Sequence, residues 1–171
     1  MPQPNAVWAV DCMSDTVYGG RRFRTLNVLD EGVREGLASE VDPSLSAERV
    51  VRVLAQVMAW RGQPQAIRLD NGPEFVADRF TSWCADHGIE LRYIQPGKPE
   101  QHAFIERFHR TYRVEVLDAY VFEALAQVSE ISAAWLQSYN EERPHEALAG
   151  LPPATYRAQL EAGNSPMKLS P

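Results

Sequence analysis

The order of the apolar segments along the N-terminal half constrains the fold of this chain more than any other feature. Residues 6–12, 22–29 and 35–41 each have the length and pattern of a strand, and only short turns join them. Consecutive strands with short connections pair as an antiparallel meander. The fold is therefore predicted to begin with three antiparallel strands, with a turn starting near Ser14.

A helix and a fourth strand are expected after the meander. Apolar residues recur at helical spacing over 46–61, Ser46 is a suitable start, and Gly62 is positioned to end the helix. Residues 66–69 then form a short apolar run of the kind found in buried strands. The crossover helix would let this strand return to the same sheet.

The remaining elements complete a layered domain. A helix is expected from Pro73 to about residue 87, a fifth strand over 89–94, and two long helices over 100–118 and 121–142. This order describes an α/β domain with a mixed five-stranded sheet flanked by helices. In that topology the first and fourth strands can lie side by side.

Length and composition are those of an ordinary globular domain. The chain has 171 residues, of which 44% are hydrophobic and 23% charged. No apolar run approaches the ~20 residues that span a bilayer, no signal peptide opens the chain, and the two cysteines form no disulfide or zinc motif. We expect a cytoplasmic protein with no membrane partner, a core domain over 1–158 and a disordered tail over 159–171.

The charge balance limits how the chain can contact nucleic acid. A net charge of −6 argues against a protein that coats nucleic acid through bulk positive charge. Basic residues are nevertheless concentrated over 20–24 and over 107–113. Any contact with nucleic acid is therefore predicted to be local.

Three acidic residues stand at the ends of predicted elements. Asp11 and Asp70 each end a strand, and Glu106 lies in the first turns of a helix, separated from Asp70 by 35 residues. If the first and fourth strands are neighbours, Asp11 lies near Asp70. Each acid alone is more simply explained as an exposed residue at the end of an element. The three together can converge on divalent cations.

Such a cluster suits magnesium or manganese. Mg²⁺ prefers oxygen ligands and keeps several waters, so one or two carboxylates for each ion suffice. Two ions roughly 4 Å apart can activate an attacking oxygen and stabilise a leaving oxygen at phosphorus. Without a cation the three carboxylates would repel one another. The pattern predicts that Asp11 bridges two ions and that Asp70 and Glu106 each complete one.

The helix around Glu106 has two different faces. Glu106 is expected on one side with His102, His109 and Arg113, groups that can contact a phosphate. A solvated helix face is the simpler alternative for such residues. The opposite, apolar face should pack on the core. It comprises Phe104, Ile105, Phe108, Tyr112 and Val116.

Further residues are candidates on the strength of their position. Lys98, in the Pro- and Gly-rich loop over 95–99, and Arg110 could contact DNA phosphates. Asn71 and Glu74 are close enough to Asp70 to orient it or the ions. The four tryptophans are expected in the core rather than as platforms for bases. They are Trp8, Trp60, Trp83 and Trp135.

Together these residues resemble the catalytic core of the DDE-type integrases, in the branch of bacterial insertion-sequence transposases akin to retroviral integrases. The resemblance is carried by Asp11, the Leu-Asp-Asn-Gly-Pro-Glu-Phe segment over 69–75, the 35-residue interval and the segment over 97–108. The Tyr-Asn-Glu-Glu-Arg-Pro-His segment over 139–145 also fits that branch. Asp-Asn-Gly alone is a weak signal, whereas the ordered set is specific and covers residues 6 to about 158.

The resemblance implies an RNase H-like fold, two Mg²⁺ or Mn²⁺ ions and polynucleotidyl transfer during DNA transposition. Asp11, Asp70 and Glu106 would be the catalytic metal ligands. Water would attack a phosphodiester at the element's end, and the freed 3′-hydroxyl would then attack target DNA. We also expect a homodimer or a larger assembly. Two alternatives stay open: a nuclease that only hydrolyses, and a non-catalytic relic that binds no metal productively.

The chain departs from the family's pattern at two points. The family usually has Asn where this chain has His102, and it often has Asn where this chain has His109. Such transposases also carry a helical DNA-binding region ahead of the core, and only ten residues precede Asp11. We therefore expect a truncated form, one product of a split reading frame or a decayed copy. Recognition of the element's end would then come from the missing region or a companion product.

Overall fold

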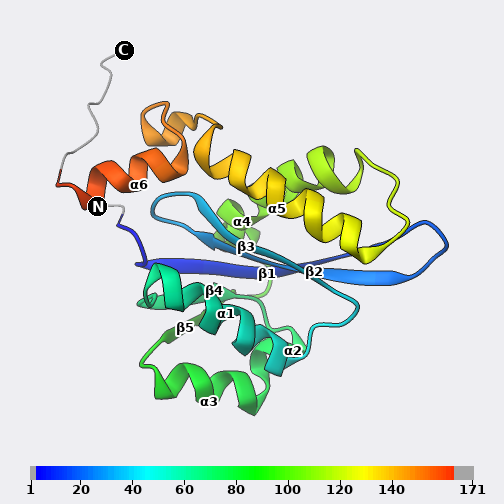
Figure 1. Cartoon of the computed structure of the whole chain (residues 1–171). Coiled ribbons are helices and arrows are strands. Elements are labelled where there is room, and N and C mark those ends of the chain that lie inside the picture. Colours follow the sequence, from blue (N-terminus) through cyan, green and yellow to red (C-terminus); the bar gives the residue numbers. More distant parts are fainter. Residues whose placement is uncertain (1–2, 164–171) are drawn as a thin grey trace.

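A twisted sheet with helices on both faces forms the protein (Figure 1). The computed structural model describes residues 3–163, and the sheet has five strands in the order β3-β2-β1-β4-β5. The predicted mixed five-stranded sheet flanked by helices is confirmed.

The sheet has an antiparallel half and a parallel half. β1 and β3 each pair antiparallel with β2, whereas β4 lies parallel to both β1 and β5. The prediction that the first and fourth strands are neighbours is therefore confirmed. The predicted turn at Ser14 is wrong, because β1 continues its pairing with β2 as far as Thr16. The strands are β1 (Val7–Thr16), β2 (Arg22–Asp30), β3 (Glu35–Asp42), β4 (Ala66–Leu69) and β5 (Glu90–Tyr93).

Three helices cover one face of the sheet (Figure 1). The Ser46 hydroxyl accepts a hydrogen bond from the Arg49 backbone N–H at 3.2 Å and so caps the first of these helices, which ends before Gly62 as predicted. The single helix predicted from Pro73 is wrong, because an extended backbone at Ala77 divides it in two. The three helices are α1 (Ala47–Arg61), α2 (Pro73–Val76) and α3 (Asp78–Asp86).

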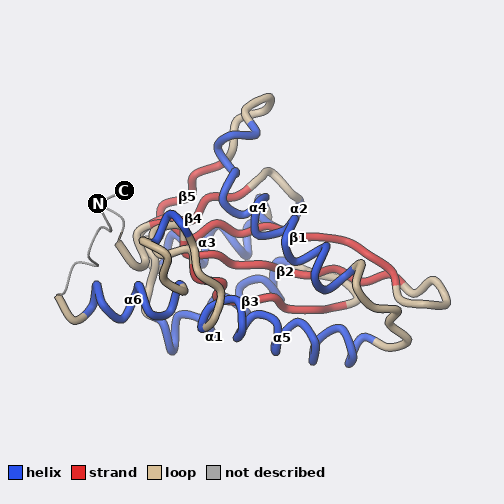
Figure 2. Tube along the Cα trace, turned by 90° about the horizontal axis from the view of Figure 1, so that it is seen from above, coloured by secondary structure: helices blue, strands red, loops and turns tan. Residues whose placement is uncertain are grey.

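The other face carries α4, α5 and α6. The helix predicted over 100–118 begins as a 3₁₀ turn, continues as α4 and ends in a π-helical segment, and the next helix starts at 125 rather than 121. Figure 2 shows the connection from β5 to α4 projecting away from the sheet. No helix within residues 3–163 is long and apolar enough to cross a membrane. The segments are η1 (Pro99–His102), α4 (Ala103–Tyr112), η2 (Arg113–Leu117), α5 (Leu125–Glu141), η3 (Glu146–Leu148) and α6 (Pro153–Glu161).

The end of the chain and two aromatic residues differ from expectation. α6 includes residues 159–161 of the predicted tail, and residues 164–171 lie outside the described part. Trp60 and Phe104 were expected in the core but are 60% and 43% exposed. Trp8 and Trp83 are buried as predicted.

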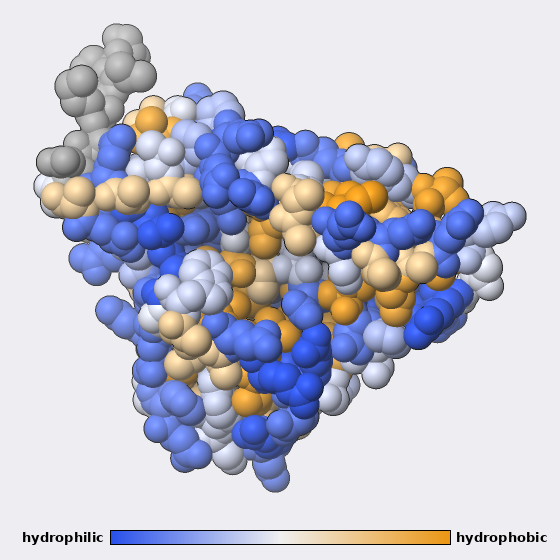
Figure 3. Space-filling model, viewed as in Figure 1, coloured by the Kyte–Doolittle hydropathy of each residue, from blue (hydrophilic) through white to orange (hydrophobic). Residues whose placement is uncertain are grey.

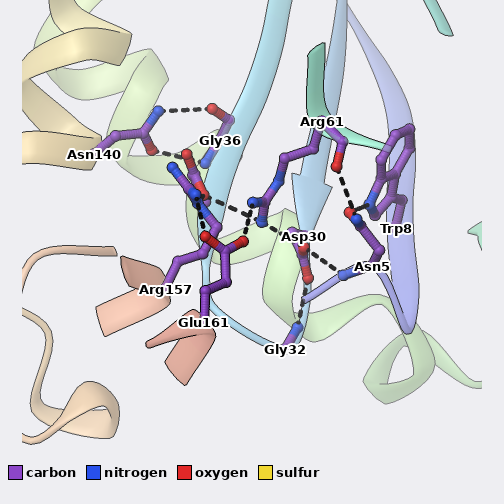
Figure 4. Close-up of polar contacts among 10 residues, drawn as sticks. Asn5, Trp8, Asp30, Gly32, Gly36, Arg61, Asn140, Arg157 and Glu161 are labelled. Carbon is purple, nitrogen blue, oxygen red and sulfur yellow. Dashed lines mark hydrogen bonds and ion pairs between the residues drawn. The ribbon is translucent and has the colours of Figure 1, made fainter. Parts of the chain in front are cut away.

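A buried ionic network joins the sheet to helices on both of its faces (Figure 4). The Arg61 guanidinium, at the end of α1, lies 2.9 Å from the Asp30 carboxylate and 3.2 Å from that of Glu35. Glu35 also accepts a hydrogen bond from Arg157 on α6 at 2.7 Å. The side chains of Asp30, Glu35 and Arg61 are almost fully buried. The position of α6 therefore depends on α1 and on the β2–β3 hairpin.

We predict that Arg61→Ala lowers the free energy of unfolding by about 3–5 kcal/mol, because it leaves Asp30 and Glu35 buried without their shared cation. The matched control is Arg79→Ala, which removes an exposed ion pair with Glu48 and should change stability little. Urea denaturation followed by circular dichroism measures both changes. Equal losses for the two variants would show that the buried network does not support the fold in this way.

Candidate active site

The parallel pairing of β1 with β4 brings Asp11 and Asp70 together. Ala9 is paired with Arg68, so the same register continued by two residues sets Asp11 level with Asp70, which directly follows β4. The negative charge of Asp70 adds to burial in raising the pKa of Asp11. The two carboxylates therefore lie close together where β4 ends. The prediction that Asp11 ends a strand is wrong, because Asp11 lies within β1 and is paired with Asn27 of β2.

The surroundings of Asp11 disfavour its ionised form. Its side chain is largely buried, and burial, followed by the charges of Asp70 and Glu106, raises the pKa of Asp11 to about 7. The Cys12 backbone N–H donates to the Asp11 carboxylate at 2.9 Å and acts in the opposite direction. A carboxylate in this position favours either a proton or a cation.

Glu106 lies on α4, close enough for its charge to influence Asp11, but its own side chain is exposed. Within residues 3–163 no group of three or more His, Cys, Asp or Glu side chains is arranged to hold a metal ion. The structure thus brings two of the three predicted ligands together and leaves the third nearby on the facing helix.

Two histidines pack against Asp11 from the helical layer. The Nε2 of His102 and the Nδ1 of His109 lie 3.7 and 3.9 Å from the same carboxylate oxygen of Asp11. Burial lowers the pKa of both imidazoles to about 4, so they are neutral near pH 7 and form no ion pair with Asp11. Neither ring nitrogen of His102 has a hydrogen-bond partner within residues 3–163. The predicted contact of these histidines with DNA stays a prediction.

The residues around Asp70 differ in what they contact. The backbone N–H of Gly72 donates to Asp70 at 2.8 Å, an interaction that the sequence pattern does not predict. Glu74 lies buried and forms an ion pair with Arg24 at 3.0 Å. A Cβ at position 72 would lie 3.0 Å from the Asp70 carboxylate and 3.1 Å from that of Glu74. Gly72 therefore leaves room for both acids. Asn71 is exposed.

The predicted basic contacts differ in whether they already form an ion pair. Lys98 is exposed in the loop after β5, and Arg110 is exposed on α4. Arg113 is already paired, with Asp15 at 3.3 Å and Asp118 at 3.7 Å. Lys98 and Arg110 thus present their charges to solvent, whereas Arg113 would have to exchange partners to bind a phosphate.

Two family models match the chain, and both describe an integrase core domain. One matches residues 1–99 and the other residues 87–153. The chain belongs to the integrase core domain family. The resemblance of its sequence to the cores of insertion-sequence transposases is thereby confirmed.

Proteins of insertion elements are among its relatives. The 39.2 kDa protein of insertion element IS476 from Xanthomonas euvesicatoria is 39% identical over 170 residues, which cover 98% of this chain and 49% of that protein. The 31.7 kDa protein of insertion element IS407 from Burkholderia multivorans is 40% identical over 159 residues, with coverage of 93% and 57%. The chain spans about half the length of the curated relatives it matches.

Solved integrase cores share the fold of this integrase core domain. The BIV integrase catalytic core domain matches with a TM-score of 0.71 at 22% identity, covering 93% of this chain and 97% of that one. The HTLV-2 integrase catalytic core domain in complex with magnesium matches with a TM-score of 0.68 at 16% identity, with coverage of 91% and 97%. The predicted RNase H-like fold is therefore confirmed.

We predict that, without metal, Asp11→Asn raises the free energy of unfolding by about 1–3 kcal/mol near pH 8 and changes it little near pH 4. Folding raises the pKa of Asp11, so wild-type stability is lost as the pH rises from the unfolded value of 3.8 to about 7. Asn carries no such penalty. Urea titrations at both pH values measure the difference.

The control for this prediction is Asp86→Asn, which removes an exposed carboxylate on α3. It should shift stability little at either pH. A large loss of stability in Asp11→Asn at the higher pH would instead mean that the Asp11 charge supports the fold.

Proposed function

We propose that this chain is the catalytic core of a transposase, which cuts a DNA phosphodiester at the end of an element and joins the freed 3′-hydroxyl to target DNA. The observation that carries the proposal is the pairing of β1 with β4, because it unites Asp11 and Asp70 opposite the helix that bears Glu106. Its membership of the integrase core domain family and its insertion-element relatives support the same conclusion.

The donor set fits divalent magnesium or manganese. Asp11 and Asp70 supply carboxylate oxygens, the ligands that these hard cations prefer. Within residues 3–163 no Lys or Arg forms an ion pair with either acid, and the two histidines beside Asp11 are neutral. A cation would thus relieve a repulsion that the protein itself leaves uncompensated. The HTLV-2 integrase core, which has the same fold, was solved in complex with magnesium.

Each residue has a distinct task in this proposal. Asp11, Asp70 and Glu106 would hold the ions. When bound, the ions supply activation of the attacking oxygen and stabilisation of the leaving oxygen. The Gly72 N–H holds the Asp70 carboxylate in place, and His102 and His109 pack against Asp11, which limits its rotation and excludes water from its buried side.

A non-catalytic relic is the second candidate function, and His102 is the observation that favours it. This imidazole is buried against Asp11, and neither of its ring nitrogens has a hydrogen-bond partner among the described residues. An imidazole without hydrogen bonds at that position could occupy space that metal ligation needs. Titration calorimetry with Mn²⁺ separates the two candidate functions, because a relic gives the same flat trace for wild type and for Asp70→Asn.

We predict that Asp70→Asn lowers strand transfer at least about a hundredfold, because the loss of one metal ligand removes several kcal/mol of transition-state stabilisation. The assay uses DNA ends already processed at the 3′ strand, with Mn²⁺. Asp86→Asn is the matched control and should retain activity. If wild type does not join the processed ends but cleaves unprocessed ends in a parallel reaction, the nuclease alternative is favoured. Equal activity in wild type and Asp70→Asn would exclude Asp70 from the reaction.

We further propose that the chain forms a homodimer through an apolar groove at the edge strand β3. The groove has a volume of about 280 Å³ and is lined by residues of β3, α1 and α5, among them Leu37, Val57 and Leu136. Trp60 is exposed beside it. Figure 3 shows hydrophobic atoms in the hollow between the two helical layers. A second copy that covers this groove would bury both apolar surface and an open strand edge.

We predict that Trp60→Glu shifts the chain from dimer to monomer in sedimentation experiments, because a charge would be buried in the interface. Val114→Glu is the matched control, since Val114 is equally apolar and 64% exposed but lies outside the groove. A dimer that survives Trp60→Glu, or dissociates equally in both variants, would exclude this groove as the interface.

A further inference from the structure

A basic cleft lies beside α4, and none of the three predicted metal ligands lines it. It is a cleft of about 490 Å³ between α4, the β2–β3 turn and the segment that follows α5. Three guanidinium groups line it, one from each of these parts of the chain: Arg107, Arg34 and Arg143. Glu146 is the one acidic residue among the described residues of its lining. Positive charge therefore dominates a hollow in a protein whose net charge is −6.

Two of these guanidinium groups are not engaged by acids. Neither Arg34 nor Arg107 forms an ion pair within the described residues, whereas Arg143 is paired with Glu115. The Arg34 guanidinium carbon lies 3.7 Å from the centre of the Phe104 ring, so the group is stacked and held in position without using its N–H donors. Donors held in this way suit an anion with several oxygens.

The backbone of Arg34 supports a role for its side chain. Arg34 has a φ of 58°, in the left-handed region that non-glycine residues rarely adopt. Glycine would relieve this strain in the β2–β3 turn but would remove the guanidinium. Burial also lowers the pKa of Arg34, the charge of Glu31 opposes this shift, and the charge of Arg107 adds a smaller lowering. The position thus bears two costs, which a bound anion would offset.

The wall of the cleft adds a buried polar atom without a partner. The Nε2 of His145 is buried and has no hydrogen bond within the described residues, and the ring packs edge-on against Tyr139 at 5.1 Å between centroids. Burial lowers the pKa of His145 and raises that of Tyr139, and the charges of Arg34, Arg107 and Arg143 lower both pKa values. All of these groups therefore surround one common space.

We propose that this cleft binds a backbone phosphate of a DNA strand, at a point separate from the carboxylates that would cut it. Arg107 and Arg34 donate to the phosphate oxygens, and His145 forms part of the wall beside them. The inference rests on the proposed function for the identity of the ligand as DNA. It adds a binding site that none of the predicted DNA contacts includes.

The geometry of α4 connects the two sites. Glu106 and Arg107 are consecutive, so they point about 100° apart around the helix axis. Arg110 is exposed and lies one turn beyond both of them, because residues three and four apart are neighbours on a helix. A strand leaving the acids can therefore pass Arg110 and reach Arg107 on the outer surface of one helix.

The test measures binding of a fluorescent DNA duplex by anisotropy over a range of salt concentrations. Arg107→Gln and Arg34→Gln together should weaken binding and lower the log–log salt slope by about 1 for each phosphate that the protein no longer neutralises. Binding should weaken equally for two unrelated DNA sequences, because a phosphate contact carries no sequence information. Arg52→Gln is the matched control, since Arg52 is exposed on α1 in the other layer.

Several outcomes would overturn the proposal. A salt slope that is unchanged in the Arg34 and Arg107 variant, or that falls equally with Arg52→Gln, removes the cleft from the DNA path. Inorganic phosphate is the second probe. If calorimetry shows that it binds wild type but not the variant while the DNA salt slopes agree, the cleft holds a free anion instead. Arg107→Gln alone, at an exposed position, guards against misfolding of the double variant.

Asp70→Asn separates this proposal from the proposed function. A wild-type salt slope in Asp70→Asn, together with a lowered slope in the cleft variant, supports the cleft whether or not strand transfer is observed. Wild-type strand transfer combined with an unchanged slope in the cleft variant overturns the cleft and leaves the proposed function standing.

Discussion

The parallel pairing of β1 with β4 is the constraint on which the candidate site depends. Both strands run in the same direction, and the register that pairs Ala9 with Arg68 sets Asp11 level with Asp70, where β4 ends. Alternation along β1 sets the direction of each side chain: Val10 packs in the core beneath α1, and Ala9 packs beneath α4. Asp11 consequently faces α4. A register shift of one residue would turn it into the opposite core.

Weakly exposed acids in this protein fall into two groups: the buried ones pair with arginines, whereas Asp11, with a side chain 19% exposed, does not. Asp30 and Glu35 share the guanidinium of Arg61, so their charges are compensated and they link α1, the hairpin and α6. Asp11 has instead another carboxylate and two neutral imidazoles around it. The first group has a structural role, because its ion pairs hold these elements together. The charge of Asp11 is unfavourable for folding, and the apolar packing on both faces of β1 offsets this cost. A weakly exposed acid without a cationic partner is typical of a functional site rather than of a structural ion pair.

Hydrophobic periodicity predicted the order of the elements, and the expected neighbouring of the first and fourth strands predicted that Asp11 lies near Asp70. Periodicity could not predict the break at Ala77, because alanine favours helices. The packing of Phe75 against Phe80 in the core overrides that preference. Periodicity also placed Phe104 in the core. The periodicity of a helix contains no information about Arg34, which lies in the distant β2–β3 turn and stacks on the partly exposed Phe104 ring.

α4 connects the sheet, the candidate site and the basic cleft, because a different side of the helix faces each of them. Ile105 and Phe108 are fully buried against the sheet and fix the rotation of the helix. With that rotation fixed, Glu106 is presented towards Asp11 and Arg107 towards the basic cleft. The distance between the DNA phosphate that would be cut at the acids and the DNA phosphate that would bind in the cleft would then be set by one rigid helix rather than by loops. A substitution at Phe108 that lets the helix turn would disturb both sites together, although Phe108 has no polar side-chain atom with which to contact either the acids or the arginines of the cleft.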